Sequence, residues 1–176
     1  MEIAKDLGNI RQIALAYAME GNIEKHIGKY DVSFKCYDSA IELGEKLNIA
    51  SLTCEFLYEN ADLLHKMGRY DDASAMDEKA LKISEEVKRA SIIFSCELLK
   101  WKLVAQKDPE SAVKNIKAML ENETNQENQA DIYFELFMIT RDEQYKNEAT
   151  KLFESLYSVA PNAVYKEKIS VMNSGK

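Results

Sequence analysis

A short motif occurs twice in this sequence, and the interval between its two copies is the strongest constraint on the fold. Gly28-Lys29-Tyr30-Asp31 recurs 40 residues later as Gly68-Arg69-Tyr70-Asp71. Self-similarity at such a period indicates an array of equivalent supersecondary units. Around both copies, apolar or small residues recur every three or four positions, which is the spacing of one helix face. The repeat therefore predicts helical hairpins, each with a tight turn at a glycine.

The hairpin around Gly68 has the clearest pattern. Its two apolar stripes are Cys54, Leu57, Ala61 and Leu64 before the turn, and Ala73, Met76, Ala80 and Ile83 after it. Gly68 lacks a Cβ and can adopt the left-handed conformation that ends a helix. Asp71 or Asp72 is expected to cap the helix that follows, because a carboxylate can accept hydrogen bonds from the free amides of the first turn.

Composition narrows the class of protein. Leu, Ala, Glu and Lys dominate a chain with few glycines and prolines, which favours an all-helical fold. A net charge of −7 argues against a dedicated nucleic-acid binder, which needs a basic face. No apolar run approaches the roughly 20 residues that span a bilayer, so we expect a cytoplasmic protein with no membrane partner. The three cysteines, Cys36, Cys54 and Cys96, lie within apolar stripes and are expected to be reduced core residues.

The repeat can be followed through most of the chain, as one domain of residues 1–176. We expect four hairpins at about 10–47, 48–88, 89–122 and 125–160, followed by a capping helix at 161–172. Asp108 and Pro109 are suited to open the second helix of the third hairpin, as a capping carboxylate followed by a proline. A terminal helix is expected because the last hairpin of a stack otherwise exposes an apolar face.

This arrangement resembles the tetratricopeptide repeat family, in a variant with a period of about 40 residues instead of the usual 34 or so. The resemblance rests on Ala14, Tyr17, Gly21, Gly28, Tyr30 and Ala40 in the first unit, and on Leu57, Ala61, Gly68, Tyr70, Ala73 and Ala80 in the second. It implies a right-handed α-α superhelix whose concave groove, lined by the first helix of each hairpin, binds a peptide or a helix of a partner protein.

Carried over by repeat register, the resemblance implies a set of groove residues. These are Asn22, Lys25, His26, Glu55, Tyr58, Asp62, His65, Lys66, Trp101, Phe134, Met138 and Arg141. Aromatic residues suit recognition, because they bury a large area with few rotatable bonds. In the alternative interpretation, Trp101 and Phe134 simply pack between hairpins.

The leading hypothesis is a non-catalytic scaffold for protein–protein interaction, with no cofactor and no metal. His26 and His65 are expected on neighbouring helices, but a metal or acid–base site needs a further converging ligand. One alternative is a regulatory or sensor domain that responds to a small ligand or peptide. Another is a homo-oligomerisation module that pairs through Ile3, Leu7 and Ile10 or through Val164 and Ile169.

Overall fold

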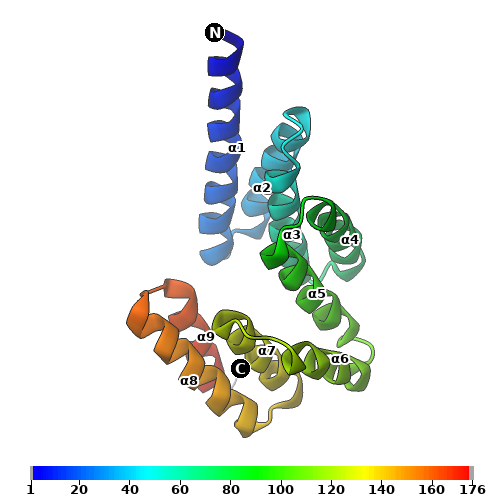
Figure 1. Cartoon of the computed structure of the whole chain (residues 1–176), viewed down its shortest axis with the longest axis vertical. Helices are drawn as coiled ribbons and strands as arrows, with labels where there is room; N and C mark the ends of the chain where they lie inside the picture. The colour runs from blue at the N-terminus through cyan, green and yellow to red at the C-terminus, as the bar shows by residue number, and fades with distance from the viewer. Residues whose placement is uncertain (1, 175–176) are drawn as a thin grey trace. The chain divides into compact units, whose positions relative to one another are not determined.

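The protein is all-helical throughout the part that the structure describes. The computed structural model describes the backbone of residues 2–174 and the side chains of residues 9–174. Within that range there are nine helices and no strand (Figure 1). They are α1 (Glu2–His26), α2 (Tyr30–Lys46), α3 (Ala50–Lys66), α4 (Tyr70–Glu86), α5 (Ala90–Val104), α6 (Pro109–Glu121), α7 (Gln126–Thr140), α8 (Glu143–Val159) and α9 (Ala163–Ser174). The predicted all-α class is confirmed.

The contacts divide the chain into two compact units, which are described separately. Unit 1 is Met1–Lys100, where α1 packs on α2, α2 on α3, and α3 on α4. Unit 2 is Trp101–Lys176, where α6 packs on α7, α7 on α8, and α9 on both α7 and α8. Helices that are consecutive in sequence therefore pack together within each unit, as in a hairpin repeat. The prediction that the whole chain is one domain stays a prediction.

The turns of unit 1 follow a regular interval. A residue with positive φ follows each of the first four helices, at intervals of 20 residues: Gly28 (80°), Asn48 (54°), Gly68 (75°) and Lys88 (57°). The three helices between them, α2, α3 and α4, are each 17 residues long. Each left-handed residue reverses the chain, and a three-residue turn completes the interval. The 40-residue repeat of the sequence is thus two identical helix-and-turn steps.

The same hydrogen bond closes each of these turns. The Lys29 amide donates to the Glu24 carbonyl at 2.9 Å, and the Arg69 amide donates to the Leu64 carbonyl at 2.9 Å. Equivalent bonds run from the Ile49 amide to Gly44 and from the Arg89 amide to Ser84, at 3.0 and 2.9 Å. This pattern satisfies carbonyl groups at the end of each helix without any side chain.

Helix capping by side chains is correctly predicted at one site and wrongly at another. Asp108 caps α6, where the Ser111 amide donates to its Oδ1 at 3.0 Å. The predicted cap by Asp71 or Asp72 is wrong, because α4 already begins at Tyr70 and a cap must precede the helix. Arg69 occupies the N-cap position without a side-chain cap, and its guanidinium pairs with Asp72 at 2.7 Å.

Replacing Lys88 with glycine is expected to stabilise the protein by about 0.5–1 kcal/mol. The left-handed conformation costs a residue with a Cβ about 1–2 kcal/mol, and the greater entropy of glycine in the unfolded chain offsets part of that gain. Urea denaturation followed by far-UV circular dichroism measures the difference. As a control, Lys82→Gly within the exposed side of α4 should destabilise by about 1 kcal/mol. A Lys88→Gly variant no more stable than wild type would contradict the account.

Each unit has its own apolar core. In unit 1 the largest cluster includes Ala14, Ala40, Cys54, Phe56, Leu57, Ala80 and Cys96. In unit 2 it consists of Ala130, Phe137, Ala149, Phe153, Tyr165 and Met172. Helices approach closely at glycines: a Cβ on Gly21 would lie 2.9 Å from the Tyr37 ring, and a Cβ on Gly44 would lie 2.7 Å from Thr53 Oγ1. Cys36, Cys54 and Cys96 are buried free thiols, so their predicted place in the core is confirmed.

One acidic side chain lies inside the core of unit 1. Asp77 of α4 is 3% exposed, and its Oδ1 has no hydrogen-bond partner. The Cys96 thiol of α5 bonds to the same carboxyl group. In the other hairpins the residue four positions after the buried small residue is Tyr37, Ile116 or Phe153, each fully buried. Asp77 therefore places a carboxyl group where the repeat otherwise has a large core side chain.

Candidate functional site

A buried ion pair joins the first helices of the two hairpins in unit 1. Lys25 of α1 is 9% exposed, and its Nζ lies 2.6 Å from Glu59 Oε2 and 3.2 Å from Asp62 Oδ2, both on α3. Burial alone would lower the pKa of Lys25, but the two carboxylates reverse the effect and raise it above its ordinary value. The ammonium is therefore charged at every physiological pH, and it is fully engaged within the protein.

The cluster extends to α2 and to the surface. The Tyr37 hydroxyl donates to Asn22 Oδ1 at 2.8 Å, and the Lys25 ammonium lies 5.7 Å from the centre of the Tyr37 ring. On the outer side, Lys66 Nζ lies 3.4 Å from Asp62 Oδ2. Burial raises the pKa of Tyr37, with Lys25 opposing that effect, so the hydroxyl stays protonated. The structure thus brings together four of the predicted groove residues, and connects them through Tyr37 and Glu59.

The other predicted groove residues of unit 1 lie on the same helices, outside this cluster. Glu55 Oε2 accepts a hydrogen bond from Arg89 at 3.0 Å, and Tyr58 is half-buried against the core. The His65 ring lies 5.6 Å from that of Tyr70, whereas His26 is exposed. In the described part of the chain, no group of three histidine, cysteine or acidic side chains is arranged to hold a metal ion.

Unit 2 contains comparable links between helices. Lys102 of α5 lies 3.1 Å from Glu135 of α7, and Lys168 of α9 bonds to Asp131 of α7. The Tyr165 hydroxyl of α9 donates to Glu127 Oε1 at 2.8 Å. In both units, a lysine therefore pairs with a carboxylate two helices away along the chain. The Lys25 and Lys102 pairs connect first helices of the expected hairpins, whereas the Lys168 pair connects the capping helix α9 to the first helix α7.

The predicted groove residues of unit 2 are partly used in packing. The Phe134 ring lies 6.4 Å from the Phe153 ring, and the Lys168 ammonium lies 5.5 Å from the centre of the Phe134 ring. Arg141 is exposed at the left-handed end of α7 and donates to Met138 Sδ at 3.9 Å. Trp101 is half-buried. The Phe134–Phe153 contact joins α7 to α8 within one hairpin, so packing of Phe134 between hairpins stays a prediction.

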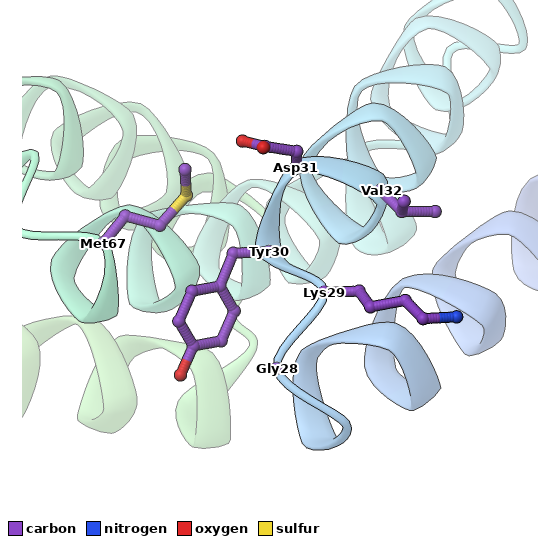
Figure 2. A pocket seen from close by; sticks show the side chains of 6 residues that line it. All are labelled: Gly28, Lys29, Tyr30, Asp31, Val32 and Met67. Atoms are coloured by element: carbon purple, nitrogen blue, oxygen red, sulfur yellow. The ribbon is translucent and has the colours of Figure 1, made fainter.

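A surface hollow of about 470 Å³ lies beside the first turn of unit 1. It is lined by Gly28, Lys29, Tyr30, Asp31, Val32 and Met67. Figure 2 shows the Tyr30 ring and the Asp31 carboxylate on the side of the turn that faces Met67, with Lys29 and Val32 pointing the other way. The hollow is formed by the two equivalent turns of the repeat, and sequence reasoning did not identify it.

Comparisons with known proteins do not assign a family. No protein-family model matches the chain, and no curated protein matches it either. None of the helices in the described range is long and apolar enough to cross a membrane. The case for a function therefore rests on the helical repeat and on the residues of its first helices.

Proposed function

We propose that this protein is a non-catalytic scaffold that binds a peptide or a helix of a partner protein. In this proposal the hairpins are tetratricopeptide-like and continue as a right-handed superhelix, and the binding surface is the face formed by their first helices. The observation that carries the proposal is that Tyr58, Asp62 and Lys66 follow one face of α3 at helical spacing, next to the Lys25 ion pairs. An ordered row of aromatic and charged groups suits recognition of an extended chain or a helix.

The buried ion pairs support this proposal through rigidity. Lys25 is held by two carboxylates, so α1 and α3 have little freedom to shift relative to each other. A surface held in its binding geometry before a partner arrives loses less entropy on association. The partly exposed edge of the cluster, with the Lys66 side chain 43% exposed, offers polar groups for the partner's backbone. A homo-oligomer or a sensor domain remains an untested alternative.

Peptides selected from a random library on the wild-type protein are expected to depend on Tyr58. Truncation of a central aromatic anchor typically costs more than about 1.4 kcal/mol, so Tyr58→Ala should weaken binding roughly tenfold or more. Trp101 is the single tryptophan and allows a fluorescence titration without a label, with calorimetry as a second readout.

Tyr157→Ala is the matched control, because Tyr157 also packs partly buried against a core, but on a second helix in unit 2. Its affinity for the same peptides should remain within about twofold of wild type. Equal losses in the two variants, or peptides that bind Tyr58→Ala as well as wild type, would refute the assignment of the surface.

A further inference from the structure

An apolar stripe on α1 is exposed to solvent. Six of the eight large apolar side chains that are exposed within residues 9–174 lie between Ile13 and Val32. Five of them form what we call the α1 outer face: Ile13 (48% exposed), Tyr17 (38%), Met19 (65%) and Ile23 (59%) on α1, and Ile27 (57%), which directly follows the helix. Single exposed apolar residues are ordinary, but a contiguous stripe marks an interaction surface.

The repeat shows what kind of element this face accommodates. Forty residues after Ile13 and Ile23, α3 has Thr53 and Leu63, which are 3% and 0% exposed. α2 packs on α3 and covers Thr53, with Gly44 so close that a Cβ would lie 2.7 Å from the Thr53 hydroxyl oxygen. Residues of the α1 outer face thus occupy repeat positions that, one hairpin later, are covered by a helix.

The charge at the centre of the stripe identifies the chemistry of the occupant. Glu20 is exposed midway between Ile13 and Ile27, whereas Glu24, one turn further along, already pairs with Lys29 at 3.5 Å. Two-fold pairing of two copies through this stripe would bring the two Glu20 carboxylates against each other, which is repulsive. With a net charge of −7, the protein also repels acidic partners in general. A basic group opposite Glu20 satisfies both conditions.

We propose that the α1 outer face binds an amphipathic helix of another protein, with an aliphatic stripe that carries a lysine or arginine at its centre. This surface is distinct from the first-helix face of the proposed function. On the side of α1 that belongs to the first-helix face, Lys25 is buried, whereas the residues of the α1 outer face are exposed. The interaction follows the helix-in-groove mode, in which residues at i, i+3, i+4 and i+7 provide the anchors.

The test uses a designed helical peptide of about 18 residues, long enough to cover the stripe. It has leucines at i, i+3, i+4 and i+7 positions, one central lysine in the stripe, and neutral alanine and glutamine elsewhere. A second peptide differs only by glutamate in place of that lysine. Fluorescence anisotropy of the labelled peptides is expected to show micromolar binding of the lysine peptide and roughly tenfold weaker binding of the glutamate peptide.

Variants of the protein locate the interaction. Ile23→Asp is expected to weaken the lysine peptide roughly tenfold or more without changing the circular dichroism spectrum, because Ile23 is exposed. Val159→Asp, at an 84% exposed apolar residue of unit 2, should leave binding unchanged. Glu20→Lys should reverse the preference, so that the glutamate peptide binds more tightly.

Three results would overturn the proposal. One is failure of the lysine peptide to bind the wild-type protein at high micromolar concentration. Another is binding that is indifferent to Ile23→Asp or to Glu20→Lys. The third is self-association of the wild type in sedimentation velocity that Ile23→Asp abolishes, which would make a second copy the occupant. None of these results bears on the Tyr58 surface, so the two proposals fail independently.

Discussion

The Asp77→Asn variant is expected to be more stable than the wild type by about 2–3 kcal/mol at pH 8, and to differ far less at pH 5. Burial raises the pKa of the Asp77 carboxyl from its ordinary 3.8 to about 7, and the Cys96 hydrogen bond opposes that shift only in part. At pH 8 the folded wild type therefore buries an ionised carboxylate with an unpaired oxygen. Asparagine removes the charge and retains an acceptor for Cys96.

The direction of the pH dependence follows from the two pKa values. Because the folded-state pKa of Asp77 is above the unfolded one, the folded protein retains a proton that the unfolded chain releases. This contribution to stability is fully present at acidic pH, below the unfolded value, and is lost as the pH rises through about 7. The wild type should thus lose stability between about pH 4 and pH 7, and Asp77→Asn should lose much less.

Urea denaturation at several pH values, followed by far-UV circular dichroism, measures this difference. Asp71→Asn is the control, because Asp71 lies exposed on the same helix and its substitution should shift all pH points equally. Parallel stability curves for wild type and Asp77→Asn over this range would show that the Asp77 carboxyl does not titrate as argued.

Lys25→Met should cause the second large effect, a destabilisation of about 2–3 kcal/mol. Methionine retains the apolar stem, but it leaves the carboxylates of Glu59 and Asp62, with side chains 28% and 14% exposed, without their shared cation. Removing one partner of a buried pair costs about 3–5 kcal/mol, and the partial exposure of Glu59 reduces that value here.

A double-mutant cycle separates the ion pair from the packing. Adding Glu59→Gln to Lys25→Met should recover part of the loss, which gives a coupling energy of about 1–2 kcal/mol. Lys29→Met is the matched control: Lys29 pairs with Glu24 at 3.5 Å but its side chain is 61% exposed, so the change should be below about 0.5 kcal/mol. A Lys25→Met variant as stable as Lys29→Met would mean that the pair contributes nothing.

The helices were predictable because their signal is periodic and local. The apolar spacing and the two Gly-x-Tyr-Asp motifs predict the helices from α2 onward to within a few residues of the observed bounds, whereas α1 begins at Glu2, well before the expected start of the first hairpin near residue 10. The turns at Asn48 and Lys88 were not predictable as left-handed, since neither side chain requires that conformation. There the regular length of the helices, and not the local residue, determines where the chain reverses.

The candidate site was predictable only in part, because its contacts join distant positions. Register identified Lys25 and Asp62, but the partner Glu59 lies 34 residues from Lys25, and only the packing of both α1 and α3 on α2 brings them together. Asp77 carried a signal that was available in the sequence: an aspartate on the apolar stripe between Ala73 and Ala80. Its burial follows from that stripe, whereas its bond to Cys96 depends on the placement of α5.

The even spacing of the left-handed residues has a consequence for how such a chain can change in length. Residues 29–68 contain two whole helix-and-turn steps, and Gly68 at their end has the same left-handed conformation as Gly28, which directly precedes them. Tandem duplication of that block would join Gly68 to a second Lys29 in the geometry that Gly28 and Lys29 already have. Growth or loss by hairpins therefore needs no new type of junction, whereas inserting one or two residues inside a helix would rotate the rest of its apolar stripe by about 100° per residue, away from its neighbour.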